Sequence, residues 1–303
     1  MRVTANMSAD ASVYNIQQGR NRLDKIQETI TSGQNINKPS DNPISSRLLL
    51  DIGDKMKGFD QFNANIIKAK SWMQFNDTAL SGMNDIMNQT QSLMNTINRG
   101  SSDPSERQNA HNQLVELKKQ MIDMANTKYG DQYIFGGSNN LVPPFNYANN
   151  TFAGDGTERQ IEIAANTPQT ISITGDRLLQ GIGANPSYGT TNILQTFDDM
   201  IAAVGDATTA SNPAAITTAV QSLTPASQQI FNAVNTNLSR MIRVDNMAKL
   251  NETNKNTLTN IIGTIQNVDM VKLGVQLNSE KNAFEASLAA TAKLSQMSLL
   301  DFL

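Results

Sequence analysis

The sequence contains no cysteine and few aromatic residues. Among its 303 residues there is one tryptophan, and aromatic residues make up 5% of the chain. Without cysteine the chain forms no disulfide, has no thiolate nucleophile and offers no cysteine ligand to a metal ion. The low aromatic content, together with 39% hydrophobic residues, favours long helices packed in thin bundles over a thick globular core.

Strong charge and long hydrophobic runs are also missing. The formal net charge is −3 and no basic block occurs, so we expect no nucleic-acid partner. No window approaches the roughly 18 apolar residues of a membrane span, so we expect no membrane insertion. Residues 1–15 lack the apolar run of about 7–15 residues of a cleavable signal peptide. The default compartment is therefore the cytosol, unless export uses a route that cleaves nothing.

Catalytic and cofactor-binding patterns are equally scarce. His111 is the only histidine, so a histidine-pair metal site is excluded and any Ser/His/Asp triad would depend on it alone. No serine lies in a nucleophile motif, and the glycines near Gly136 and Gly181 lack the phosphate-loop lysine. We expect no enzymatic activity and no cofactor. A single Ca²⁺ at the turn around Asp155 stays an open alternative.

Both ends of the chain carry the pattern of an amphipathic helix. Residues 7–32 and residues 263–303 place apolar side chains at steps of three, four and seven, which is typical of a coiled-coil seam. Such a one-sided helix needs a partner for its apolar stripe. We therefore favour self-association or partner docking over a simple intramolecular hairpin. The candidate assembly and partner contacts are Ile16, Leu23, Ile26, Ile30, Leu277, Phe284, Leu288, Leu299 and Phe302.

Residues 32–43, after the N-terminal helix pattern, carry signals that end one helix and begin another. Gly33 directly after the helical run predicts a helix stop. Asp41 or Asn42 can cap the next helix, with Pro43 at its first position. This segment is therefore predicted to be a structured turn between two helices rather than a flexible linker.

The middle of the chain predicts helices around a small β module. A long helix spans residues 43–99, and a second, capped by Asp103, runs to about residue 129. Residues 159–165 and 169–174 alternate with period two and are separated by residues 166–168, and residues 145–152 read as two short strands around Asn149 and Asn150. Helices return at Asn192 and at residues 212–262, where Pro225 predicts a break or the first turn of a new helix. The methionines of these helices form either a core or a binding groove, and we favour the core.

The predicted fold is mainly α with a small β domain. We expect an elongated rod of long antiparallel helices from both termini, with an inserted antiparallel β module at its tip. Three domains are predicted. Residues 1–42 with 264–303 form a terminal helical domain, residues 43–135 with 190–263 form a helical bundle, and residues 136–189 form the β-rich insertion.

Three segments resemble a known family. They are SGQNINKPSDNPISSRL at residues 32–48, GDQYIFGGSNNLVPPF at residues 130–145 and LAATAKLSQMSLLDFL at residues 288–303. The first is similar to the helix break of the flagellin superfamily, although Asn42 stands where that pattern has a second aspartate. The second and third resemble the FlgL family of hook–filament junction proteins, which is the third class of flagellar hook-associated proteins.

The resemblance implies a flagellin-like fold and a structural role in the bacterial flagellum. Such proteins leave the cytoplasm through the flagellar type III export apparatus and form a ring between the hook-side junction protein and the flagellin filament. Their terminal helices form the inner core and their β insertion faces outward. A cytosolic export chaperone is expected to hold the C-terminal helix before export. The alternatives are flagellin itself and, from another class, a cytosolic coiled-coil scaffold protein.

Overall fold

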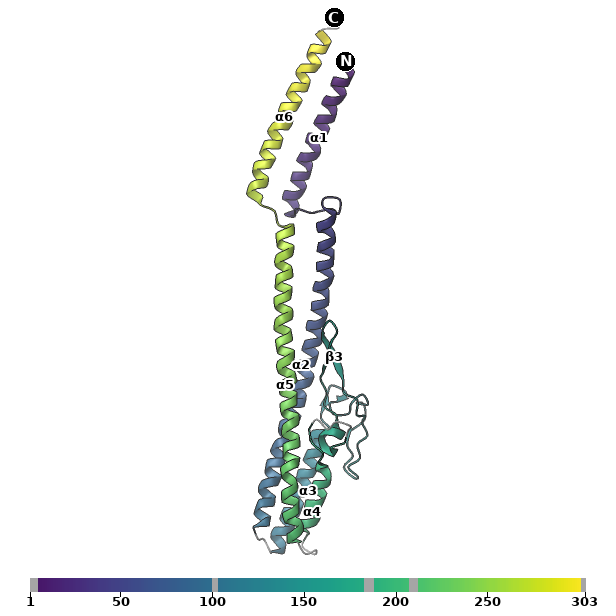
Figure 1. Ribbon diagram of the computed structural model, residues 1–303, viewed down its shortest axis with the longest axis vertical. Coiled ribbons are helices and arrows are strands. Elements are labelled where there is room, and N and C mark those ends of the chain that lie inside the picture. Colours follow the sequence, from purple (N-terminus) through teal and green to yellow (C-terminus); the bar gives the residue numbers. More distant parts are fainter. Residues whose placement is uncertain (1–4, 100–102, 183–187, 207–211, 301–303) are drawn as a thin grey trace. The chain divides into compact units, whose positions relative to one another are not determined.

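The computed structural model describes residues 5–99, 103–182, 188–206 and 212–300, with side chains from residue 10 to residue 293 within these ranges. Long helices dominate it (Figure 1). The helices are α1 (Ala5–Ser32), α2 (Pro43–Asn98), α3 (Pro104–Ala125), α4 (Ile193–Val204), α5 (Pro213–Gln266) and α6 (Met270–Leu300), with a short π-helical turn at Asp176–Gln180. The strands are β1 (Lys128–Tyr129), β2 (Gln132–Tyr133), β3 (Gln160–Ala164) and β4 (Thr167–Thr170).

The chain divides into two compact units. Unit 1 comprises Met1–Gly58 and Thr253–Leu303, and unit 2 comprises Phe59–Glu252. Helices α2 and α5 contribute residues to both units. The predicted fold class, mainly α with long helices and a small antiparallel β part, is confirmed. The three-domain division stays a prediction, since its boundaries at residues 42 and 264 lie close to helix ends whereas the two units divide within α2 and α5.

The core of unit 2 lies between α2, α3, α4 and α5. Methionine and leucine side chains from α2 are fully buried in it, together with Phe197 of α4 and Ile230 of α5. The interpretation of the methionines as core residues is confirmed for those with no exposed surface: Met73, Met83, Met87, Met94 and Met121. Burial on this scale, at about 25 cal/mol per Å² of apolar surface, is the main stabilising contribution to the unit.

The predicted helix caps of unit 2 are present. The side chains of Asp103, Asn192 and Asn212 each accept a hydrogen bond from a backbone N–H in the first turn of the helix that follows. Each bond satisfies one donor that the helix itself leaves without a partner. The caps therefore set the starts of α3, α4 and α5 where the sequence predicted them.

The break predicted at Pro225 is wrong, because α5 continues through it. Proline inside a helix removes one backbone hydrogen bond and crowds the carbonyl four residues before it, at a cost of about 3 kcal/mol. The flanking side chains of Leu223, Ala226 and Ile230 are fully buried. Packing of this face offsets the local cost and keeps the helix continuous.

The C-terminal helix begins later than predicted. Residue 263 belongs to α5, which ends at Gln266, and α6 begins at Met270. The carboxylate of Asp269 accepts hydrogen bonds from the backbone N–H groups of Val271 and Lys272, at 3.0 and 3.1 Å. Asp269 therefore caps a new helix, a signal that the apolar periodicity alone did not reveal.

The β part is smaller than the sequence predicted. Strand β4 ends at Thr170, so Ile171 and Ile173 lie beyond it although both are buried. A turn with Asn166 at φ 54° joins β3 to β4. Instead of two short strands around Asn149 and Asn150, the structure has a single antiparallel bridge between Phe145 and Phe152. Burial of the isoleucines thus reflects packing on the bundle rather than extension of the hairpin.

Polar side chains of two helices attach the β3–β4 hairpin to the bundle. From α2, the carboxamides of Asn65 and Asn76 donate to main-chain carbonyls of residues 162 and 171, both at 2.9 Å. From α5, Asn251 donates to the carbonyl of residue 163 at 3.1 Å, and Arg240 donates to that of residue 172 at 2.8 Å. Asn76 and Asn251 are buried, so these bonds also satisfy groups that would otherwise be costly inside the protein.

Candidate assembly interface

Helices α1 and α6 of unit 1 lie side by side (Figure 1). The structure brings together most of the candidate contact residues from the two ends of the chain. The half-buried ones are Ile16, Leu23, Ile26 and Ile30 of α1 and Leu277 and Phe284 of α6. The seam therefore forms an intramolecular pair, but one in which none of these six side chains reaches full burial.

A glycine lets the two helices approach. Gly19 of α1 is buried, and a β carbon built on it would lie 3.1 Å from Cδ2 of Phe284. Nearby, Nε of Arg22 and a carboxylate oxygen of Glu280 are 3.0 Å apart, in a pair that is largely exposed. Exposed ion pairs contribute little, typically under about 1 kcal/mol. The phenylalanine packed against the glycine is thus the more specific contact of the pair.

The three remaining candidates, at the C-terminal end of the set, are either exposed or outside the described residues. Leu288 keeps 43% of its surface exposed. The side chain of Leu299 and all of Phe302 lie outside the described residues. The candidate set also leaves out several apolar side chains that the structure exposes: Val13, Tyr14, Ile44, Leu50, Val271 and Val275. Their exposure, rather than their periodicity, is the signal that identifies them.

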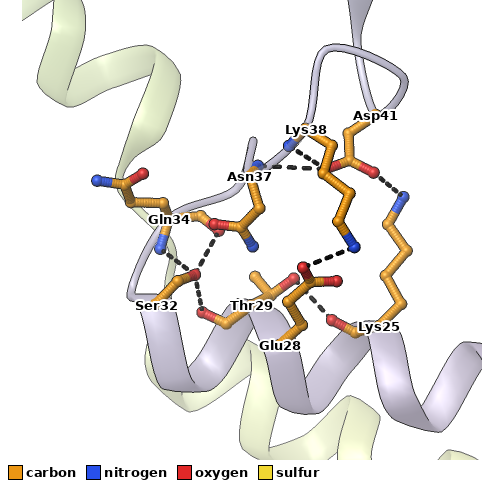
Figure 2. Close-up of polar contacts among 8 residues, drawn as sticks. All are labelled: Lys25, Glu28, Thr29, Ser32, Gln34, Asn37, Lys38 and Asp41. Atoms are coloured by element: carbon orange, nitrogen blue, oxygen red, sulfur yellow. Dashed lines mark hydrogen bonds and ion pairs between the residues drawn. The ribbon is translucent and has the colours of Figure 1, made fainter.

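The turn between α1 and α2 begins at a left-handed glycine. Gly33 has φ 68°, and its N–H donates to the carbonyl of Thr29 at 3.0 Å. Next to it, the hydroxyl of Ser32 accepts from the N–H of Gln34 at 3.1 Å (Figure 2). Only glycine adopts this φ without strain, so the predicted helix stop is confirmed.

Asp41 organises the rest of the turn (Figure 2). Its carboxylate pairs with Nζ of Lys25 at 3.0 Å and accepts the backbone N–H groups of Asn37 and Lys38 at 3.2 and 3.0 Å. The hydrogen bond from Lys25, followed by the two from the backbone, holds the pKa of the Asp41 carboxyl below its usual value. The loop is therefore folded back onto α1.

A second ion pair joins the same loop to α1. Nζ of Lys38 lies 2.9 Å from a carboxylate oxygen of Glu28. The hydrogen bond to that carboxylate raises the pKa of Lys38. Together with the pair at Asp41, it gives the turn two attachments to the last two turns of α1.

Asn42, rather than Asp41, caps α2. Its side-chain oxygen accepts the N–H of Ser45 at 3.0 Å, and Pro43 is the first helical residue. The sequence left both candidates open, and the structure gives each a separate role. Asn42 starts α2 while Asp41 closes the turn.

The α1–α2 turn is also bound to the segment between α5 and α6. The N–H of Asn35 donates to the carbonyl of Gln266 at 2.7 Å. Gln34 and Asn267 form an antiparallel bridge. The two chain segments that enter and leave the α1–α6 pair are thus hydrogen-bonded to each other, which fixes the base of the pair.

Other classes of site have no counterpart in the described residues. Within ranges 5–99, 103–182, 188–206 and 212–300 there is no group of three or more His, Asp or Glu side chains that could hold a metal ion. In the same ranges, none of the helices combines the length and apolar character needed to cross a bilayer.

The chain is similar to several proteins of the bacterial flagellum. Residues 3–140 match the family of the bacterial flagellin N-terminal helical region. The chain is similar to flagellar hook-associated protein 3 of Escherichia coli K12, with 22% identity over 259 residues, covering 83% of this chain and 81% of the relative. The corresponding protein of Salmonella typhimurium is 20% identical over 186 residues, covering 61% of this chain and 59% of the relative.

Solved structures share the fold. FlgL of Xanthomonas campestris superposes with a TM-score of 0.59 at 19% identity, over 70% of this chain and 100% of the other. FlgL of Bacillus cereus gives a TM-score of 0.59 at 17% identity, over 71% and 99%. The predicted resemblance, made from three short motifs, is confirmed by comparisons that extend over most of the chain.

Proposed function

We propose that the chain belongs to the flagellar hook-associated protein 3 (FlgL) family and is a structural subunit of the bacterial flagellum that connects the hook side to the flagellin filament. The observation that best supports this proposal is the half-buried α1–α6 pair, whose candidate contacts remain partly exposed in a single chain. A catalytic role is not part of the proposal. Flagellin is not favoured, since the curated relatives are hook-associated proteins.

The α1–α6 pair is the proposed assembly interface. Its contacts are the seam residues Ile16, Leu23, Ile26, Ile30, Leu277, Phe284, Leu288, Leu299 and Phe302. Exposed apolar surface gains about 25 cal/mol per Å² when it is covered. Covering Leu288 and Val275 would therefore favour assembly. The proposed partners are neighbouring copies in a ring, the hook-side junction protein and flagellin.

The roles proposed for the three predicted domains are those that the resemblance to this family implies. Residues 1–42 with 264–303 form the inner core of the tube, and residues 43–135 with 190–263 form its wall. Residues 136–189 face the exterior. Attachment of the β3–β4 hairpin to the bundle by Asn76, Asn251 and Arg240 supports a rigid outer insertion.

Export precedes assembly in this proposal. The chain would leave the cytoplasm through the flagellar type III apparatus without signal cleavage, and a cytosolic chaperone would hold α6. An exposed, apolar terminal helix such as α6 is a suitable chaperone target, because its surface would otherwise associate prematurely. The final location is the extracellular flagellum at the hook–filament junction.

A deletion strain tests the function. A strain that lacks this protein but still makes flagellin should secrete flagellin as monomer and carry hooks without filaments. Expression of the intact chain should restore filaments. Normal filaments in the deletion strain would contradict the proposal.

A further inference from the structure

A shallow hollow on α5 has the arrangement that receives the side chains of another helix. It has a volume of about 310 Å³, and all of its lining residues come from α5: Ser239, Ile242, Arg243, Asn246, Met247 and Leu250. These positions form two overlapping sets with steps of three, one and three residues, 239–242–243–246 and 243–246–247–250. Four residues in this spacing make one hole of knobs-into-holes packing. The hollow is therefore two consecutive holes.

The two holes face outward. Ile242 is 53% exposed and Leu250 is 51% exposed. The opposite side of α5 is the one that packs, since Val244 and Asn251 are buried against the rest of unit 2. The centres of the two holes are offset by four residues, which is about 6 Å along a helix. A partner helix that fills both holes must present two apolar side chains four residues apart.

Arg243 belongs to both holes and adds a charge requirement. It is exposed, and the part of the chain that the structure describes gives it no ion-pair partner. It also lines the neighbouring polar groove with Asn235 and Thr236, nearer the N-terminal end of α5. Helical side chains lean toward the N-terminus of their helix. A carboxylate on the partner should therefore lie beyond the 239–246 hole, on that N-terminal side.

The first turns of α2 carry two apolar side chains four residues apart and a carboxylate beyond them. Ile44 is 83% exposed and Leu48, four residues later, is 45% exposed. Asp51, one turn further along the same face, is exposed as well. On α6, Val271 and Val275 have the same spacing, but the residue one turn further is Asn278, which has no charge to pair with Arg243.

We infer that the N-terminal turns of α2 of a second copy dock, antiparallel, into the hollow of α5. Ile44 fills the 243–250 hole, Leu48 fills the 239–246 hole, and Asp51 lies beside Arg243. The two contacting surfaces differ, so the contact is heterologous and repeats from copy to copy into a ring or helix. The inference rests on the proposed function, because it concerns copies within the assembled flagellum.

Disulfide cross-linking tests the contact in the assembled structure, because the natural chain has no cysteine. Two full-length variants, Leu48→Cys and Ser239→Cys, are co-expressed with different tags in the deletion strain, and isolated flagella are oxidised. We expect a covalent dimer that carries both tags. The matched control pairs Leu48→Cys with Leu250→Cys, which only the parallel orientation would bring together, and should give no such dimer.

The outcomes separate the contact from the function. Tagged protein present in flagella without the Leu48–Ser239 dimer, or with the control dimer instead, overturns the docking while leaving the junction role intact. Absence of the wild-type protein from flagella would overturn the junction role itself, and the docking with it.

A charge exchange tests the pairing independently. Arg243→Glu should lower the amount of protein incorporated into flagella by about tenfold, since it sets two carboxylates against each other. The double variant Arg243→Glu with Asp51→Arg should restore incorporation to near the wild-type amount. Unchanged circular dichroism of both purified variants would show that folding is retained. Equal loss in the single and double variants would contradict the pairing.

Discussion

Gly19 of α1 lies directly against Phe284 of α6, with only 3.1 Å between the place of a β carbon and the ring. The two residues are far apart in sequence, and their contact defines how closely the terminal helices pack. Gly53 of α2 offers a matched comparison, because no atom lies within 4 Å of the place of its β carbon.

Alanine at these two glycines should therefore have different effects. In a helix interior, replacing glycine by alanine stabilises by about 1 kcal/mol. Gly53→Ala should show this gain, whereas Gly19→Ala should lose it, because Phe284 must move. Chemical denaturation of the purified chains, followed by circular dichroism, measures both. An equal gain at the two positions would mean that the Gly19–Phe284 contact does not constrain the pair.

Acid should loosen the α1–α2 turn at Asp41. The folded-state pKa of Asp41 is lowered by Lys25 and the loop N–H groups, so its contribution is present above the unfolded-state pKa of about 3.9 and is lost as the pH falls through the lower folded-state value. Amide exchange at Asn37 and Lys38, corrected for intrinsic rates, should rise over that range. In Asp41→Asn the same amides should already exchange fast at neutral pH. Protection that is independent of pH in the wild type would contradict this assignment.

Alkaline conditions act on the other ion pair of the turn. The pKa of Lys38 is raised by Glu28, so its contribution is full below the ordinary lysine value of about 10.4 and is lost as the pH rises through the raised one. A side-chain titration of Lys38 by NMR should give a midpoint above the ordinary lysine value. In Glu28→Gln the Lys38 midpoint should fall. The same midpoint in the wild type and in Glu28→Gln would be evidence against the pair.

The cap of α2 should tolerate aspartate but not alanine. Asn42→Ala removes the acceptor for the N–H of Ser45 and should lower the free energy of unfolding by about 1 kcal/mol. Asn42→Asp keeps a side-chain acceptor and places a negative charge at the helix N-terminus, which is favourable. Denaturant unfolding of the two variants compares them directly. A similar loss for both would show that the amide nitrogen of Asn42, not its oxygen, matters.

A charge on the exposed face of α6 should separate assembly from folding. Leu288→Asp should reduce incorporation into flagella or binding of the export chaperone, while the helical content of unit 2 stays unchanged in circular dichroism. Leu288→Met is the volume-conserving control and should assemble normally. Loss of the whole fold in Leu288→Asp would instead place this residue in the core of the single chain.

Local signals in the sequence predicted the helix starts better than the helix ends. Caps such as Asp103 and Asn192 act within one turn, so their chemistry is visible without a structure. Pro225 misled because buried neighbours on α5 outweigh its local cost. The start of α6 was missed although its cap, Asp269, is local, because the apolar periodicity alone did not reveal it. The bridge that holds Asn267 to Gln34, more than two hundred residues away, is visible only in the structure.

The candidate interface was predicted in part for the same reason. Periodicity identified the side of each terminal helix that faces the other, as Leu23 and Leu277 confirm by their partial burial. It gave no indication of the outward side, where Val271 and Val275 are exposed. The exposure of those positions depends on how the folded chain packs, which periodicity does not report.

The two asparagines that hold strand β3 bind its main-chain oxygen atoms, not its side chains. Asn65 and Asn251 donate to the carbonyls of residues 162 and 163, and every residue type supplies such a carbonyl. The anchoring residues on the helices are therefore demanding positions, whereas an outward residue of the hairpin such as Glu162 is free to change. The exposed side chains of such a strand can therefore change while its attachment to the helices stays the same.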